Sequence, residues 1–125
     1  MTQLPQHLGV ILIDHGSRQS AANQMLLDVV KVFKKTTDTT IVEPAHMELA
    51  SPTLDEAFAA CVKQGATEIV IHPYFLAPGR HSTQDIPRMA AQVAQRFPQT
   101  PYRVTDPLGV DSRIAEVILL RIQED

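Results

Sequence analysis

An uninterrupted apolar run, Leu8–Ile13, constrains the fold of this chain more than any other segment. Its sequence, LGVILI, is rich in β-branched residues and contains no polar side chain. A strand of this kind is buried on both faces, which is typical of a parallel sheet covered by helices. The run ends in the polar sequence DHGSR, from Asp14 to Arg18, so chemically active side chains begin where the strand stops.

Three further strand patterns follow, and each precedes an amphipathic helical pattern. The expected strands cover residues 39–49 and 67–76, and residues 100–110 are expected to form a short fourth strand plus a turn. The expected helices begin near Ser20, Ser51, Asp85 and Asp111. Pro44 removes a donor from the second strand, which favours a sheet edge or a bulge, and an edge position fits the strand order 2-1-3-4. The chain is therefore expected to be an α/β protein, with a four-stranded parallel sheet and helices on both faces.

Length and composition limit the classes of protein that this chain can belong to. The 125 residues suit one domain, 1–125, and the net charge of -3 argues against general nucleic-acid binding. A single cysteine, Cys61, makes no internal disulfide and is expected to be a small buried apolar residue. The amino end lacks the pattern of a signal peptide, and no apolar run approaches the ~20 residues of a membrane span. We expect a cytoplasmic protein without a membrane partner.

Three chemically active residues are expected to meet at one edge of the sheet. His15 follows the first strand, Glu48 ends the second, and His81 follows the third. The carboxyl ends of parallel strands share an edge, and open α/β sheets place their chemistry there. Two neighbouring imidazoles suit Fe²⁺, Co²⁺, Ni²⁺ or Zn²⁺. Glu48 fits equally a ligand, an orienting group or a surface charge.

The segment before the third helix is expected to be a loop. Pro78 and Gly79 break the strand, so Arg80–Thr83 are placed in a loop and a helix restarts at Asp85–Pro87. Other histidines carry weaker signals. His72 shares a strand face with apolar neighbours and is interpreted as structural, whereas His46 fits either a structural residue or a ligand.

Several familiar catalytic patterns are not matched. Ser17 lacks the glycine that precedes a nucleophile elbow by two residues, because His15 stands there. Asp14 occupies the place where a histidine phosphatase has arginine before its histidine. No glycine-rich nucleotide motif occurs in the sequence, so no ATP requirement is expected.

Four segments in order resemble the small class II chelatases that insert metal into sirohydrochlorin, the CbiX and SirB group. They are GVILIDHGSR, IVEPAHMELASPTL, HPYFLAPGRHSTQDIP and PYRVTDPLGV, and together they span nearly the whole chain. The EPAHMEL and PGRH segments are most similar to plant and cyanobacterial sirohydrochlorin ferrochelatases. The resemblance implies a flavodoxin-like chelatase fold in which His15 and His81 bind the metal, with Glu48 nearby. Plant relatives also carry cysteines for a [2Fe–2S] cluster, and this chain, with Cys61 alone, departs from that pattern.

The resemblance also implies substrates and an assembly. Longer relatives carry two such domains, so a single domain implies a homodimer that binds the tetrapyrrole in a cleft. The divalent metal enters as a substrate, Fe²⁺ by resemblance, and no organic cofactor is expected. Cobalt or nickel insertion, and a metal or tetrapyrrole carrier without enzymatic activity, remain alternatives.

Metal insertion sets its own chemical requirements. Two pyrrole protons must leave, and neutral imidazole can accept a proton or bind a metal loosely. The carboxylates of sirohydrochlorin need local donors. The candidates are Ser17, Arg18, Arg80, Ser82, Thr83 and Arg88.

Overall fold

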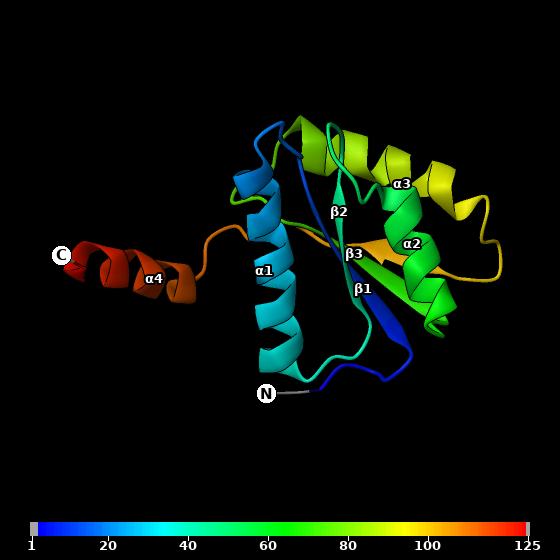
Figure 1. The fold of residues 1–125 in the computed structure, drawn as a ribbon, viewed down its shortest axis with the longest axis horizontal. Coiled ribbons are helices and arrows are strands. Elements are labelled where there is room, and N and C mark those ends of the chain that lie inside the picture. Colours follow the sequence, from blue (N-terminus) through cyan, green and yellow to red (C-terminus); the bar gives the residue numbers. More distant parts are fainter. Residues whose placement is uncertain (1–2, 125) are drawn as a thin grey trace.

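The computed structural model describes residues 3–124, which form a parallel sheet of order β2-β1-β3-β4 between helices (Figure 1). The strands are β1 (Leu8–Asp14), β2 (Val42–His46), β3 (Glu68–Pro73) and β4 (Tyr102–Val104). The helices are α1 (Ser20–Thr37), α2 (Leu54–Lys63), α3 (Ile86–Ala94) and α4 (Ser112–Gln123), with a π-helical turn, η1 (His81–Asp85), before α3. The predicted α/β class and strand order are confirmed. Pro44 lies on edge strand β2, opposite Leu12.

Alternation along the strands divides the core into two layers. One layer lies under α1 and includes Val10, Leu12, Leu26 and Val30. The other lies under α2 and α3 and includes Ile11, Ile13, Phe58 and Ile86. The continuous apolar run of β1 is required because its even and odd residues fill different layers.

Cys61 is a fully buried residue of the α2 layer, as its helical context predicted. Burial, with a smaller contribution from Glu43, raises the pKa of the Cys61 thiol to about 12. Because the thiolate is the reactive form, we expect no reaction of the native protein with Ellman's reagent at about pH 8. Unfolding in guanidinium should release one reactive thiol per chain. Rapid labelling of the native protein would contradict the burial.

The second helix begins two residues later than the sequence analysis placed it. Ser51 was expected to cap the helix, but the capping residue is Thr53. Its Oγ1 accepts from the Glu56 backbone N–H at 3.2 Å, while the Thr53 N–H donates to the Glu56 carboxylate at 2.9 Å. Such a reciprocal pair satisfies two backbone groups at once. Gly65 follows the helix with φ of +100°, and its predicted role after the carboxyl end is confirmed.

The predicted loop at Arg80–Thr83 is wrong, because His81–Asp85 form a π-helical turn that continues into α3. Gly79 holds this turn. Its carbonyl accepts from the Thr83 backbone N–H at 2.8 Å and from the Thr83 hydroxyl at 2.6 Å. Side-chain bonds of this kind stabilise a turn without producing an apolar period in the sequence.

Helix α4 begins as predicted but packs differently from the prediction. Asp111 accepts from the Arg113 backbone N–H at 2.9 Å and caps the helix. Helical spacing predicts an inward face of Ile114, Val117, Ile118 and Ile122, and this is wrong within the single chain, since no residue of α4 is buried. Figure 1 shows α4 standing away from the sheet. No helix within residues 3–124 is both long enough and apolar enough to cross a membrane.

Candidate functional site

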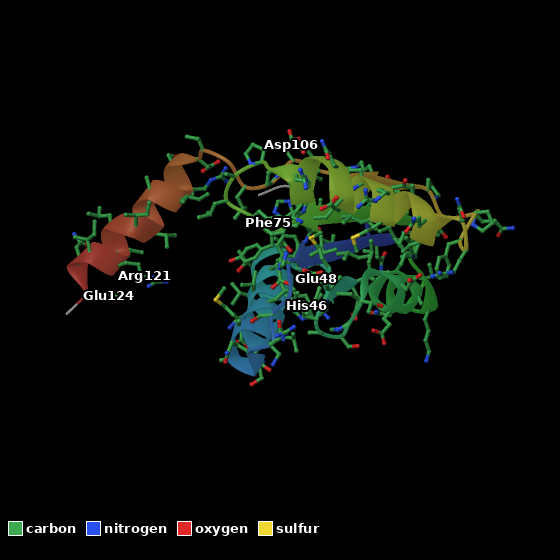
Figure 2. The ribbon with its side chains drawn as sticks, turned by 90° about the horizontal axis from the view of Figure 1, so that it is seen from above. His46, Glu48, Phe75, Asp106, Arg121 and Glu124 are labelled. Atoms are coloured by element: carbon green, nitrogen blue, oxygen red, sulfur yellow. The ribbon has the colours of Figure 1, made fainter. Side chains whose placement is uncertain are left out.

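The candidate site lies at the carboxyl edge of the sheet, which faces the viewer in Figure 2. His15 follows the last residue of β1, and His81 opens η1 after β3. Their imidazole rings lie edge to face, with centroids 4.7 Å apart and planes at 70°. The fold therefore brings together the two histidines that the sequence analysis selected.

The hydrogen bonds of His15 determine which ring nitrogen faces Glu48. Nδ1 lies 3.2 Å from the carbonyl oxygen of Gly16, and because a carbonyl only accepts, Nδ1 carries the hydrogen. Nε2 lies 3.3 Å from Oε1 of Glu48. In a neutral ring Nε2 presents a lone pair, so this contact is favourable only when Nε2 holds a proton or a cation lies between the two groups. The pair therefore suits proton acceptance or metal binding.

His81 is oriented by a carboxylate. Its Nδ1 lies 3.1 Å from Oδ2 of Asp85, and the other oxygen of Asp85 accepts from Arg88 at 2.9 Å. With Nδ1–H donating to Asp85, Nε2 of a neutral His81 keeps its lone pair for another partner. A carboxylate behind an imidazole is a common way of orienting a metal-binding histidine.

The site is open to solvent on the side of the histidines. The side chains of His15 and His81 are 42% and 50% exposed, and that of Glu48 is 59% exposed. The ring of Phe75 lies beside His81, with centroids 6.5 Å apart. Residues 3–124 contain no group of three His, Cys, Asp or Glu side chains arranged to hold a metal ion. The candidate donors are a pair of imidazoles flanked by carboxylates.

His46 lies apart from this open pair. Its side chain is fully buried, and its Nδ1 lies 2.6 Å from Oδ1 of Asp14, its partner in the strand register. Its Nε2 has no hydrogen-bond partner, so the ring is held from one side. Alternation along the expected strand 39–49 predicts that His46 and Glu48, both labelled in Figure 2, share one strand face. Glu48 instead lies beyond the end of β2 and turns to His15.

His72 has the structural surroundings that the sequence analysis favoured. Its Nδ1 donates to the hydroxyl of Thr105 at 2.8 Å, and that hydroxyl donates to the Asp106 carbonyl at 3.1 Å. Burial lowers the pKa of His72, so the ring is neutral at physiological pH. It lies on the α1 side of β3, away from the pair of exposed histidines.

The residues that were predicted to bind substrate carboxylates differ in whether they already form ion pairs or hydrogen bonds within the protein. Arg18 and Arg80 are exposed and form no ion pair within residues 3–124, whereas Arg88 bonds to Asp85. The Ser17 hydroxyl accepts from the Gln19 backbone N–H at 3.0 Å. Their roles toward a substrate stay predictions.

The hydroxyls of η1 are held by the backbone of the turn. Ser82 is buried and its hydroxyl bonds to both the N–H and the carbonyl of Gly79, while Thr83 donates to the same carbonyl. A cavity of about 570 Å³ beside η1 is lined by Ser82, Thr83 and, across it, Asp106. It adjoins the turn that carries His81. Substrate contacts by either hydroxyl stay a prediction.

The sequence analysis missed Asp85 and Asp14 as members of the site. Asp85 was read only as the start of a helix, although its spacing of four residues from His81 is the spacing of helical neighbours. Because the sequence analysis placed Arg80–Thr83 in a loop and began the helix at Asp85, it did not treat His81 and Asp85 as neighbours on one helical turn. Asp14 pairs with His46 through strand register, which spacing along the chain does not reveal.

Comparisons with known proteins agree with this architecture. A family model described as CbiX matches residues 9–125. The chain is 49% identical to the chloroplastic sirohydrochlorin ferrochelatase of Arabidopsis thaliana, over 92% of this chain and 51% of the relative. It is 32% identical to the sirohydrochlorin cobaltochelatase of Methanopyrus kandleri, over 94% of this chain and 96% of the relative.

A solved structure gives the same picture. The sirohydrochlorin chelatase SirB of Bacillus subtilis subspecies spizizenii, in complex with cobalt, superposes with a TM-score of 0.86 at 31% identity. The match covers 93% of this chain and 50% of that one. The chain thus spans about half the length of the plant and Bacillus proteins, and nearly all of the archaeal one.

Proposed function

Because the chain belongs to the CbiX family, we propose that it inserts a divalent metal ion into sirohydrochlorin. The observation that carries the proposal is the open pair of imidazoles, His15 and His81, at the carboxyl edge of the sheet. We propose Fe²⁺ as the metal, in line with the 49% identity to a protein named as a ferrochelatase. Cobalt insertion is the second candidate, because the archaeal relative is named as a cobaltochelatase.

In this proposal the two histidines receive the metal and release it again. Two imidazoles leave coordination positions open, so a pyrrole nitrogen of the substrate can displace a water or a protein donor. Asp85 holds His81 in one orientation through Nδ1. The metal is a substrate, and no organic cofactor or nucleotide takes part.

Proton removal is proposed for His15 with Glu48. The insertion of a divalent metal releases two pyrrole protons, which must pass to a base. Nε2 of His15 faces the Glu48 carboxylate at 3.3 Å, so a proton taken up by that nitrogen has the carboxylate as its hydrogen-bond acceptor. Glu48 is more than half exposed, so the proton can pass from the pair to solvent.

The substrate carboxylates are proposed to meet the cations around the histidines. Arg18 lies in the segment after β1 and Arg80 in the segment between β3 and η1, and neither has an ion-pair partner within residues 3–124. Guanidinium groups bind carboxylates through paired hydrogen bonds. Arg88 and the hydroxyls of Ser17, Ser82 and Thr83 complete the proposed set.

We also propose that the protein acts as a homodimer. The chain matches half of the plant relative and half of the SirB chain, so two copies supply what one longer chain contains. A single domain over residues 1–125 and a cytoplasmic location stay predictions from the sequence, and the plant relative is named as chloroplastic.

A turnover assay under anaerobic conditions tests the activity. Sirohydrochlorin in excess over protein is mixed with Fe²⁺ or Co²⁺, and the change in tetrapyrrole absorbance is followed against a reaction without protein. We expect many turnovers per chain, faster with Fe²⁺ than with Co²⁺. Conversion that stops at one equivalent per site would instead support the alternative, a carrier of metal or tetrapyrrole. The order of the two metal rates decides between the ferrochelatase and cobaltochelatase assignments.

A further inference from the structure

A buried histidine joins the ends of the two strands that lead to His15 and Glu48. The side chain of His46 is fully buried, and its Nδ1 lies 2.6 Å from Oδ1 of Asp14. Asp14 ends β1 and directly precedes His15, while His46 ends β2 and lies two residues before Glu48. The two partners face each other in the strand register. The contact therefore links the two chain segments that continue into the site.

The position of the ring hydrogen follows from the surroundings of His46. Its Nε2 has no hydrogen-bond partner within residues 3–124. A hydrogen on that nitrogen would be a buried donor without an acceptor, and such donors are rare in folded proteins. In the neutral ring the hydrogen is therefore on Nδ1, which donates it to the Asp14 carboxylate. Hydrogen bonds to an ionised acceptor are short and strong, in agreement with the separation of 2.6 Å.

The other contacts between His15 and Glu48 are too weak to fix the two side chains. These side chains are 42% and 59% exposed, and an exposed ion pair contributes little. Two backbone bonds continue the ladder beyond β2. The Met47 N–H donates to the Asp14 carbonyl at 2.9 Å, and the Glu48 N–H donates to the His15 carbonyl at 3.2 Å. They lie at the open end of the ladder, where a backbone separates most easily.

We propose that His46 is a positioning residue for the reaction, which holds Glu48 beside His15 through its hydrogen bond to Asp14. The inference rests on the proposed metal insertion, in which His15 accepts a pyrrole proton and Glu48 is its hydrogen-bond partner. Without the bond, the Asp14 carboxylate can turn to solvent, since its side chain is already 22% exposed. The ends of β1 and β2 then separate, and the distance from Nε2 of His15 to Glu48 increases.

The contact acts between β1 and β2 and not between β1 and β3. His81 follows β3, which pairs with the opposite edge of β1. A backbone hydrogen bond of 2.7 Å, from the Tyr74 N–H to the Ile13 carbonyl, joins β1 and β3 near their ends. The distance between His15 and His81 is therefore fixed without His46. We expect replacement of His46 to slow proton removal and to leave the metal affinity nearly unchanged.

Two replacements of nearly equal shape separate this role from packing. Asparagine places an amide N–H where the imidazole has its Nδ1–H, whereas leucine places a methyl group there. His46→Asn should keep at least about a third of the parent insertion rate, and His46→Leu should lose about 10-fold. His46→Leu should be at least as stable toward denaturant, because the asparagine oxygen stays buried without a partner. A packing role predicts that rate follows stability, and a positioning role predicts opposite orders.

A double-variant cycle tests whether His46 acts through Glu48. Glu48→Gln alone is expected to slow insertion about 10-fold, and His46→Leu added to it should cost less than about twofold more, because coupled groups are not additive. A further loss of about 10-fold would overturn the proposal. The dissociation constant for Co²⁺ alone, measured anaerobically, should stay within about threefold of the parent in each variant.

Thr39→Val is the matched control for the cycle. Thr39 is a buried polar residue before β2, at the opposite end of the strand from the site, and its hydroxyl lies 2.6 Å from that of Thr37. The replacement removes a buried side-chain hydrogen bond of the same chain segment at nearly constant shape. We expect a lower stability and an unchanged insertion rate.

Exchange of backbone amides with solvent, measured by NMR, tests the positioning without any activity. In His46→Leu the Met47 and Glu48 N–H groups should exchange at least about 10-fold faster, relative to the Val10 N–H, which bonds to the Ile41 carbonyl at 2.9 Å. In His46→Asn they should stay within about threefold of the parent. Unchanged exchange in His46→Leu, or an unchanged insertion rate, would overturn the proposal. A parent protein that inserts no metal would refute the proposed function, and the exchange rates then decide separately whether His46 holds the strand ends together.

Discussion

Alanine in place of His15 or of His81 is expected to lower the rate of metal insertion into sirohydrochlorin by at least about 100-fold. The two rings lie 4.7 Å apart, so the loss of either removes half of the donor pair. Because the two act as a unit, the double variant should be little slower than the slower single variant. The measurement is the initial rate of the absorbance change at saturating metal, with anaerobic Co²⁺ titration as a separate readout of metal binding.

Three further variants test whether the loss of rate is specific to the two histidines and to the groups that contact them. His7 is exposed and lies outside the site, so His7→Ala should leave the rate unchanged. Glu48→Gln and Asp85→Asn keep the shape of the groups that contact His15 and His81 but remove their charge. Each should cost about 10-fold, the range found for groups that orient metal-binding histidines. Full activity in both histidine variants would exclude the proposed donor pair.

The position of the site was predictable because it follows from topology. Parallel strands end at one edge, so His15 after β1 and His81 after β3 had to be neighbours once β1 and β3 were adjacent. Pro44 favoured an edge position for β2, which fits a strand order in which β1 pairs with both β2 and β3. These steps could be taken from the sequence because proline strongly restricts the backbone and the direction of parallel strands fixes which edge carries the loops.

The details around the histidines were not predictable in the same way. The π-helical turn is held by hydroxyl bonds to Gly79, and a proline followed by glycine indicates a break whether or not a turn follows. The pair formed by the buried His46 and the partly exposed Asp14 depends on strand register. For α4, the apolar pattern predicts a buried face, but amphipathicity does not say what the helix packs against, and the structure leaves this face exposed.

Gly16 connects the fold to the site, and its replacement by alanine is expected to destabilise the protein by about 3 kcal/mol. Its φ of +91° is unfavourable for alanine, and a Cβ atom there would lie 1.9 Å from the backbone oxygen of Glu48. The approach is close because the Glu48 backbone N–H donates to the His15 carbonyl at 3.2 Å. The added methyl must therefore separate the segments that carry His15 and Glu48.

Alanine substitutions at two other glycines separate the backbone cost of a positive φ from the steric cost of the added Cβ atom. The measurement is the free energy of unfolding by denaturant. Gly65 also has a positive φ, +100°, but a Cβ there meets nothing within 4 Å, so Gly65→Ala should show the backbone cost alone, about 1 kcal/mol. Gly79→Ala meets neither restriction and should stay within about 0.5 kcal/mol of the parent. For Gly16→Ala the expected loss corresponds to a fall of roughly 10 °C in the thermal midpoint. If Gly16→Ala costs no more than Gly65→Ala, the contact with Glu48 is looser than 1.9 Å implies, and insertion activity should then be retained.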